Sequence, residues 1–448
     1  MLIQEGSPNR VSFIFIIMGK LKISKIEVRK LFGVYNYDLQ YTSSDVTYDN
    51  LMILYGDNGT GKSTILRMIY YLLSNKERNG HKTELANIAF ESFLISFTDG
   101  SYIKAFREND EFHWLGKYSI TYSIKGQTDT FTLRAERDDE KWAIRMKNFP
   151  AEKKYFLLLE LLKDEDILFI SDRRKEINGV DHTAIEEIET FNSRMRIRRI
   201  EKREEEVEHE IRLLQEWLIN RALSASKKGE EGTSIIYAKL IEQFSANNLV
   251  EENEKSLEDI KNELEIIAEK AKPYVDMGFL NETDYKYFLQ NIDKTQESKI
   301  GVVQAILTPY IETLNNKMMA LNDLMDILSY LLESLSSYLH EKTISFSVAD
   351  GFSIQHVKNG ENVSFECLSS GEKQLLILFS KVIRNSSKCS FIIIDEPEIS
   401  LNIKWQRMLM NTLNYFVSGN HAQFIIATHS FEILSKHMSN VVRLQDIE

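Results

Sequence analysis

Short apolar runs that end in glycine or polar residues are the clearest structural signal in this chain. They are LMILYG (51–56), DILFISDRR (166–174), SFIIIDEP (390–397) and AQFIIATHS (422–430). Strands covered on both faces have continuous apolar runs of this kind, whereas half-exposed strands alternate. We therefore expect buried strands of a mixed or parallel sheet, drawn from both ends of the chain. Helices are expected after the first and third runs.

Alternating apolar and polar positions follow the first of these strands. KLKISKIEVRKLFGVYNYDL (20–39) predicts a strand and an aromatic turn, and FLISFTDGSYIKAF (93–106) predicts a hairpin turning at Asp99 and Gly100. EFHWLGKYSITYSIKG (111–126) continues the antiparallel pattern, and a short helix is expected near Tyr155 to Leu162. An antiparallel β region thus accompanies the buried sheet.

Alternating steps of four and three residues place apolar side chains on one helix face in the central region. One series is Val207, Ile211, Leu214 and Leu218, and the other is Leu314, Met318, Leu321, Met325, Leu328, Leu332, Leu335 and Leu339. Such a seam must pack on another helix. We expect a helical insertion over residues 181–340, with a loop at SASKKGEEGTS (224–234) and no long rod.

The order of these signals is α/β, then helical, then α/β again. The predicted divisions are an N-terminal extension at 1–17, a first α/β lobe at 18–180, the helical insertion at 181–340 and a second α/β lobe at 341–448. The apolar run VSFIFIIM (11–18) is too short to span a bilayer, and no small-residue cleavage site follows it. We favour Met18 as the natural start.

Composition narrows the classes of function. The 448 residues, 43% hydrophobic and 27% charged, suffice for two or three packed globular units. A net charge of −12 argues against a generally basic, nucleic-acid-coating surface, although a local basic groove would still attract phosphates. The two cysteines, Cys367 and Cys389, form no CxxC pair. That excludes a disulfide framework and a cysteine-based zinc hook, and favours a cytoplasmic location.

A phosphate-binding loop follows the first apolar run. GDNGTGKST (56–64) fits the pattern G-x-x-x-x-G-K-[ST], and it lies between a predicted strand and a predicted helix. Its glycines let backbone N–H groups converge on phosphate oxygens, and the helix adds its positive end. Lys62 would reach the β and γ phosphates, and Ser63 would hold Mg²⁺. We expect ATP and Mg²⁺ here, with contacts from Gly56, Asn58, Gly59, Gly61, Lys62, Ser63 and Thr64.

Two further strand ends carry candidate chemistry. FIIIDEPE (391–398) would bring Asp395 to the phosphate end of the sheet as a Mg²⁺ ligand, with Glu396 placed as the general base. His429, at the end of IIATHS (425–430), could hydrogen-bond the γ-phosphate, and we predict it as catalytic with Glu396. Without the other motifs, His429 would be interpreted as a satisfied histidine at a strand end.

Together with LSSGEKQ (368–374), these motifs resemble the ABC-type ATPase head, as in SMC and Rad50-like proteins. The resemblance implies an α/β P-loop head, a mixed sheet plus an antiparallel β subdomain, interrupted by an α-helical coiled-coil insertion. In that family the signature closes over the nucleotide of a second subunit. This maps Ser369, Ser370 and Gly371 onto ATP bound by another copy, and so implies a homodimer or higher homo-oligomer. Glu372 replaces the glutamine of transporter signatures, as in the SMC branch, which makes a transporter motor the poorer match.

A narrower resemblance is to the ATPases of prokaryotic antiviral systems, of the Septu and PARIS types, and to the head of OLD-family nucleases. The segments that carry it are EVRKLFGVYNYDL (27–39), ILYGDNGTGKST (53–64), LSSGEKQLLILF (368–379) and DEPEISLNIKWQ (395–406). It implies a D-loop from Glu398 to Asn402 that crosses the dimer interface, and FISDRRKEI (169–177) resembles a strand end of the same group with no role assigned.

The chain departs from that group in two places. No glutamine matches the Q-loop, because Gln127 falls in a predicted hairpin. After His429 there is no room for the TOPRIM nuclease domain of OLD proteins, so we expect any nuclease effector to be a separate polypeptide.

Three functional hypotheses remain. The first is a slow, regulatory ATPase subunit of an antiviral complex, which dimerises on ATP and holds or releases a nuclease or toxin. The second is a DNA-repair ATPase of the RecF or Rad50 kind that clamps DNA, and the third is a nucleotide-bound scaffold with almost no turnover. The basic run SRMRIRRIEKR (193–203) leaves nucleic-acid contact open, although a solvated helix laced with ion pairs is the plainer interpretation. No membrane partner is expected.

Overall fold

The structure is a computed structural model, and its described residues form two compact units. Those residues are 21–41, 50–74, 80–108, 114–124, 126–138, 141–144, 153–155, 167–172, 194–230, 256–281, 300–418 and 422–447, with Phe288, Gln290 and Ile292. The first unit comprises 1–197 and 381–448, and the second comprises 198–380. The division into two α/β lobes and a helical insertion stays a prediction. Residues 341–380, which were assigned to the second lobe, lie in the same compact unit as the helices.

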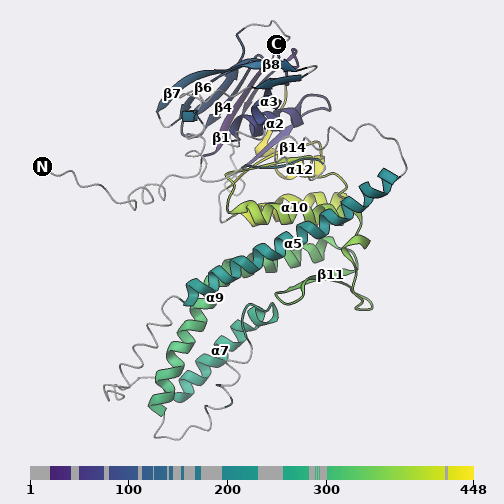
Figure 1. Ribbon diagram of the computed structural model, residues 1–448. Helices are drawn as coiled ribbons and strands as arrows, with labels where there is room; N and C mark the ends of the chain where they lie inside the picture. The colour runs from purple at the N-terminus through teal and green to yellow at the C-terminus, as the bar shows by residue number, and fades with distance from the viewer. Residues whose placement is uncertain are drawn as a thin grey trace, which may run out of the picture. The chain divides into compact units, whose positions relative to one another are not determined.

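A five-stranded parallel sheet lies in the first unit (Figure 1). Its strands, in spatial order, are β10 (Ile167–Ile170), β13 (Phe391–Asp395), β14 (Gln423–Thr428), β3 (Leu51–Tyr55) and β15 (Val441–Arg443). Each neighbouring pair is parallel. β10, β13 and β14 are buried along their whole length, which explains their unbroken apolar runs. The predicted α/β fold class is confirmed.

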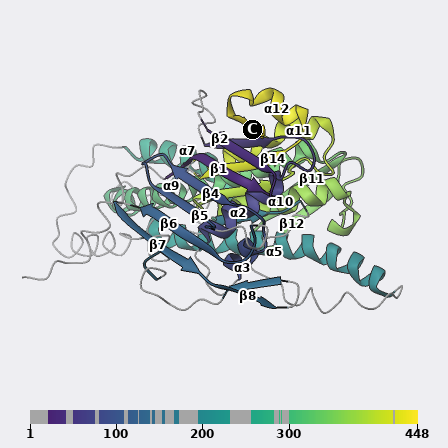
Figure 2. The ribbon, with the colours of Figure 1, turned by 90° about the horizontal axis from the view of Figure 1, so that it is seen from above.

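A six-stranded antiparallel sheet belongs to the same unit, and Figure 2 shows its strands from above. In spatial order they are β2 (Tyr35–Gln40), β1 (Ile23–Leu31), β4 (Ser92–Phe97), β5 (Tyr102–Phe106), β6 (Tyr118–Ile124) and β7 (Gln127–Leu133). Burial alternates along β4 and β5, as a half-exposed sheet requires. The predicted hairpin at Asp99 and Gly100 is confirmed, and Gly100 has the left-handed φ of 84° that this turn needs.

Helix α2 (Lys62–Leu73) joins the two sheets in one hydrophobic core. Ile65 and Ile69 belong to the same buried cluster as Ile26 of the antiparallel sheet and Ile393 of the parallel sheet. The buried ammonium of Lys82, in α3 (His81–Ala86), donates to the carbonyls of Tyr71, Leu72 and Ser74. These bonds satisfy carbonyls that the end of α2 leaves without helical partners. The phosphate-loop helix is thus fixed along its length and at its end.

The first unit contains further strands and helices outside its two large sheets. They are β8 (Ala135–Asp138), β9 (Lys141–Ile144), α11 (Ile403–Val417), α12 (Phe431–Lys436) and the 3-10 helix η6 (Met438–Asn440). Asn402 caps α11 by accepting from the N–H of Trp405, and Ser430 caps α12 by accepting from the N–H of Ile433. Both caps stand directly after loops that carry candidate site residues.

The second unit contains most of α5 (Arg194–Glu230), with α7 (Leu257–Asp276) and α9 (Ile300–Tyr338). α7 and α9 run side by side in Figure 1, and the Tyr274 hydroxyl donates to Asn322 across the pair at 3.3 Å. The four predicted seam residues of α5 are buried. The residues of the second predicted series, from Leu314 to Leu339, are also buried except Leu332. Leu332 is half-buried, and its neighbour Leu331 is buried instead. The helical insertion is therefore present, and its coiled-coil packing stays a prediction.

A hairpin of β11 (Lys342–Ser347) and β12 (Gly351–His356) follows the helices in the second unit. The short helix η5 (Phe365–Cys367) then leads into α10 (Ser370–Ser386), whose last residues belong to the first unit. Within the second unit, the Ser380 hydroxyl of α10 donates to the carbonyl of Glu210 in α5 at 2.9 Å.

The loop expected at 224–234 is wrong over its first half, because α5 continues to Glu230. The Ser224 hydroxyl donates to the carbonyl of Asn220 one turn earlier, so this serine is accommodated inside the helix. Residues 231–234, the extension at 1–17 and most of the helix expected at 155–162 lie outside the described residues.

In the part of the chain that the structure describes, no helix is both long and apolar enough to cross a membrane.

Candidate nucleotide-binding site

Three neighbouring strands of the parallel sheet deliver the predicted site residues to one edge. The phosphate loop follows β3, Asp395 ends β13 and His429 follows β14, and these strands lie in the order β13, β14, β3. Because all are parallel, their carboxyl ends meet at the same edge of the sheet. Ligands of open α/β sheets bind outside that edge. The fold thus brings together residues that are far apart in the sequence.

The phosphate loop has the backbone shape that its glycines predict. Gly59 and Gly61 have φ of 85° and 91°, a region that other residues enter only with strain. A Cβ on Gly61 would stand 2.7 Å from a methyl group of Leu31, so a side chain there would also force Leu31 to move. Gly56 is half-buried, and Asn58 and Gly59 are exposed at the tip of the loop. An accessible loop of this shape fits a phosphate chain.

The ammonium of Lys62 is held inside the phosphate loop. Its Nζ donates to the carbonyl oxygens of Gly56 at 2.8 Å and Asp57 at 3.1 Å, and the side chain is 6% exposed. The Tyr37 hydroxyl braces the same loop by donating to the carbonyl of Thr60. The loop is therefore formed around its own lysine, and phosphate oxygens could replace the two carbonyls as acceptors.

Ser63 and Asp395 meet at the start of α2. The Ser63 hydroxyl donates to Oδ1 of Asp395 at 2.9 Å, and Asp395 is 2% exposed. Burial raises the pKa of the Asp395 carboxyl, and the hydrogen bond from Ser63 opposes the rise. Hydroxyl and carboxylate oxygens are the ligands that Mg²⁺ prefers beside phosphates. This pair therefore fits the predicted Mg²⁺ site, and Thr64 follows it on α2 half-buried.

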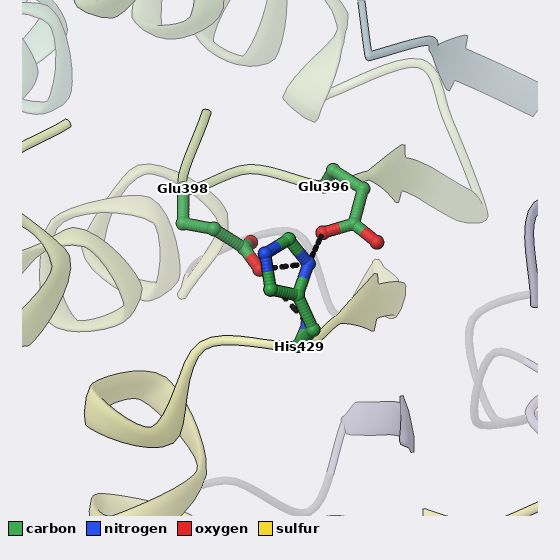
Figure 3. A group of neighbouring side chains, drawn as sticks. All are labelled: Glu396, Glu398 and His429. Carbon is green, nitrogen blue, oxygen red and sulfur yellow. Dashed lines mark hydrogen bonds and ion pairs between the residues drawn. The ribbon is translucent and has the colours of Figure 1, made fainter. Parts of the chain in front are cut away.

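Glu396 and His429 form a contact pair beside that site (Figure 3). Nδ1 of His429 lies 2.5 Å from Oε2 of Glu396, and the imidazole is 56% exposed. Burial, reinforced by the neighbouring Glu398 carboxylate, raises the pKa of Glu396 to about 7, and His429 opposes that rise. A carboxylate with a pKa near neutrality suits a general base. The two residues predicted as catalytic are thus brought together.

Glu398 does not project from the loop that was expected to cross a dimer interface. Its side chain is 5% exposed, and Oε1 lies 3.4 Å from Nδ1 of His429. The same oxygen accepts hydrogen bonds from the turn that follows β14. The predicted D-loop from Glu398 to Asn402 is therefore anchored in its own unit at its first residue, and its role at an interface stays a prediction.

The signature residues lie in the second unit, at the start of α10. Ser369 and Ser370 are exposed and Gly371 is buried. The Ser369 N–H donates to Oε2 of Glu372 at 2.8 Å, and the Glu372 N–H donates to the Ser369 hydroxyl at 3.4 Å. This reciprocal pair is a capping box.

Lys342 adds a third member to that capping box. Its ammonium, from β11, pairs with Oε1 of Glu372 at 2.8 Å. The glutamate in the place of a transporter glutamine thus has a structural use inside the chain. A capping box, serine followed three residues later by glutamate, was visible in LSSGEKQ and could have predicted it.

Two contacts were not foreseen from the sequence, namely the Lys342–Glu372 ion pair and the buried bonds of Glu398. No local pattern signals either, since the partners lie about thirty residues apart. Gln127, left without a role, begins β7 and is exposed in the antiparallel sheet.

The sheet order, the loop around Lys62 and the Ser63–Asp395 pair define a P-loop nucleotide-binding protein. Residues 51–435 match the family described as "AAA domain, putative AbiEii toxin, Type IV TA system", and the chain belongs to that family of AAA-type ATPase domains.

Similarity to individual proteins is more limited. A stretch of 100 residues is 31% identical to a protein named "Retron Vc95 probable ATPase" from Vibrio cholerae serotype O1 biovar El Tor. The match takes in 20% of this chain and 19% of that relative. Among solved structures, Smc head domains from Pyrococcus furiosus and Pyrococcus yayanosii are 12% and 13% identical, with TM-scores of 0.39 and 0.37. They cover 95% and 96% of this chain, and 94% and 97% of their own.

Proposed function

We propose that the protein binds and hydrolyses ATP and uses the nucleotide to control a separate effector in an antiviral complex. The observation that carries the ATPase part is the Ser63–Asp395 hydrogen bond of 2.9 Å, with Glu396 as the next residue along the chain. A metal-binding hydroxyl and carboxylate therefore stand next to a carboxylate suited to activate water. All three lie at the edge of the sheet where the phosphate loop begins.

Each group has a definite task in this proposal. Backbone N–H groups of the loop and the ammonium of Lys62 bind the phosphates, and Lys62 exchanges the Gly56 and Asp57 carbonyls for phosphate oxygens. Ser63 and Asp395 would hold Mg²⁺, which when bound neutralises charge on the phosphate oxygens. Glu396 accepts a proton from the attacking water. His429, in contact with Glu396, faces outward and contacts the terminal phosphate.

The signature is proposed to act on the nucleotide of a second copy. Ser369 and Ser370 are exposed, and α10 begins at Ser370, so hydroxyls and free helical N–H groups are available to an anion. The resemblance to ABC-type heads supports this arrangement, in which two copies enclose ATP between them. Slow turnover would then let the closed dimer persist as a signal.

The antiviral setting and the separate effector rest on resemblance. They are supported by the segments that resemble antiviral ATPases, and the local match to the retron ATPase agrees with them. An effector of the nuclease or toxin class would be retained or released as the heads close. A direct DNA clamp of the RecF or Rad50 kind is the competing function, which the net charge of −12 disfavours.

Two measurements test the proposal. Purified protein with Mg²⁺ and ATP should release phosphate, and the rate should depend on protein concentration if two copies form the site. The chain purified untagged from its host should carry a nuclease or toxin. If the purified chain carries only DNA, the DNA clamp is favoured. If the chain does not bind ATP, both the effector-controlling ATPase and the DNA clamp are excluded.

A further inference from the structure

One buried carboxylate connects the loop after β13 to the turn after β14. Oε1 of Glu398 accepts from the Thr428 hydroxyl at 2.5 Å, from the His429 N–H at 2.9 Å and from the Ser430 N–H at 3.0 Å. Thr428 and Ser430 are also buried, at 0% and 7% exposure. Figure 3 shows the glutamate side chain reaching across to the histidine turn. Three consecutive residues are thus held by a single oxygen.

The chemistry of these donors explains why the acceptor is a carboxylate. Because Oε2 of Glu398 has no hydrogen-bond partner among the described residues, a glutamine could keep the accepting oxygen, but it would accept without the negative charge that strengthens the three bonds and would bury an unpaired amide. The Thr428 hydroxyl also accepts from the Ser430 N–H at 3.0 Å, so its own proton is directed to Glu398. The turn therefore depends on the charge of Glu398 as well as its shape.

The loop that carries Glu398 is itself braced. Glu396 and Ser400 have left-handed φ of 48° and 65°, a conformation that persists in non-glycine residues only where the surroundings hold it. The Ile399 N–H donates to the carbonyl of Glu396, and the Leu401 N–H donates to that of Glu398.

A second connection between loop and turn passes through α11. Gln406 donates to the carbonyl of Leu401 and accepts from the Ser430 hydroxyl at 2.7 Å. The loop and the histidine turn therefore form one hydrogen-bonded body, in which Glu398 makes the direct link.

That body fixes the imidazole of His429 against Glu396. The backbone N–H of His429 is bound by Glu398, and Nδ1 then lies 2.5 Å from Oε2 of Glu396 and 3.4 Å from Oε1 of Glu398. Nδ1 faces the two carboxylates, which leaves Nε2 as the ring nitrogen available to a ligand. Holding the backbone of His429 thus sets the direction in which its ring points.

We propose that Glu398 is a positioning residue, which fixes the turn of residues 428–430 and thereby the contact between His429 and Glu396. This inference rests on the proposed ATPase function, because the positioned pair is its catalytic pair. Glu398 touches neither nucleotide nor water in the proposal and acts only through His429.

The test compares Glu398→Gln with wild-type protein in two measurements. In the nucleotide-free protein, the amides of His429 and Ser430 should exchange hydrogen about ten- to a hundredfold faster, since they lose a charged acceptor. In the ATPase assay, kcat should fall by a similar factor or more, while KM for ATP stays within about twofold, because misplacing a catalytic group costs rate rather than binding. A general loss of structure would instead raise KM as well.

Two further variants keep the test decisive. Thr428→Val removes the hydroxyl that donates to Glu398 and accepts from the Ser430 N–H, with little change in side-chain volume. It should show the same effects in weaker form at His429 and in kcat, including when Glu398→Gln does not fold. Glu432→Gln is the matched control, because Glu432, on α12, forms an ion pair outside the site with the 55% exposed Arg407 of α11. That control should leave exchange and kcat at wild-type values.

The positioning role of Glu398 and the ATPase function can be contradicted separately. Unchanged exchange at His429 and Ser430 in both variants, or faster exchange with unchanged kcat, would overturn the positioning role. If wild-type protein does not hydrolyse ATP, the proposed function fails, and exchange alone then decides whether Glu398 holds the turn.

Discussion

The hydroxyl of Ser63 donates a hydrogen bond of 2.9 Å to Oδ1 of Asp395, although 332 positions separate them in the sequence. The bond joins α2, the helix after the phosphate loop, to the end of β13. In the sheet, β13 lies two strands from β3, the strand that precedes the loop. A serine and an aspartate placed in this way are ready to share a divalent cation beside a phosphate chain.

Replacing Lys62 with alanine should weaken ATP binding by about ten- to a hundredfold, because the phosphates lose a charge-assisted donor worth roughly 1.5–3 kcal/mol. Titration calorimetry with ATP and Mg²⁺ measures this directly. Lys404→Ala, at an exposed position on α11, is the matched control and should bind like wild type. Equal affinity of the Lys62 variant and wild type would contradict the role of the phosphate loop.

Glu396→Gln should still bind ATP but hydrolyse it about 10²–10⁴-fold more slowly, since amides are poor proton acceptors. Phosphate release measures the rate, and size-exclusion chromatography with ATP should show the variant accumulating as closed dimers. Glu432→Gln makes the same chemical change outside the site and should hydrolyse ATP normally. Wild-type turnover in the Glu396 variant would remove it as the base.

Mixing two inactive variants should restore part of the activity if the signature works on a neighbouring copy. Lys62→Ala chains bind nucleotide weakly and lack the lysine that contacts the phosphates, but they keep Ser369, while Ser369→Arg chains bind nucleotide but lack the signature. A mixed dimer contains one intact site, so ATPase activity should rise on mixing and pass through a maximum with the ratio of the two chains. Absence of rescue at every ratio would count against action in trans.

The capping box of α10 should make stability depend on pH. Burial alone would raise the pKa of Glu372, but Lys342 and the N–H and hydroxyl of Ser369 bring it below its ordinary value of 4.5. A depressed carboxyl pKa contributes stability above the unfolded-state pKa, and this contribution is lost as the pH falls through the folded-state value. The ion-paired carboxylate therefore stabilises the fold at neutral pH and loses that effect in acid.

Thermal unfolding of wild type and Glu372→Gln at several pH values tests this expectation. Near pH 7 the wild type should be more stable by about 1 kcal/mol, as for other helix caps, and the difference should shrink below about pH 4.5. The other carboxyl groups titrate alike in both proteins, so the difference reports on Glu372. A stability difference between the two proteins that stays constant from pH 7 to strongly acidic conditions would contradict a stabilising ion pair at Glu372.

The sequence predicted most of the elements because their signals are local. Continuous apolar runs marked β3, β13 and β14, and the Asp-Gly turn marked the β4–β5 hairpin. The phosphate loop and the acids after β13 were found because phosphate binding demands glycine and lysine at fixed spacing. Their placement at one edge of the sheet followed from parallel topology.

What the sequence did not predict depends on contacts between distant segments. The Glu398 carboxylate reaches a turn about thirty residues later, and nothing in DEPE distinguishes an outward from an inward side chain. The pairing of Lys342 with Glu372 likewise requires the β11–β12 hairpin to be in place. The loop expected at 224–234 is wrong over residues 224–230 for another reason. The glycine and serines suggested a loop, but α5 continues to Glu230, with the Ser224 hydroxyl donating to the carbonyl of Asn220 inside the helix.

β3 pairs with β14 on one side and β15 on the other, both from the last stretch of the chain. A nascent polypeptide that has exposed its phosphate loop at the ribosome therefore has neither neighbour of that strand until residues 423–443 have been made. The phosphate loop of an incomplete product lacks Asp395, Glu396 and His429 altogether. Premature termination anywhere in the helical region would accordingly yield a fragment in which β3 has neither neighbour and Ser63 has no aspartate partner.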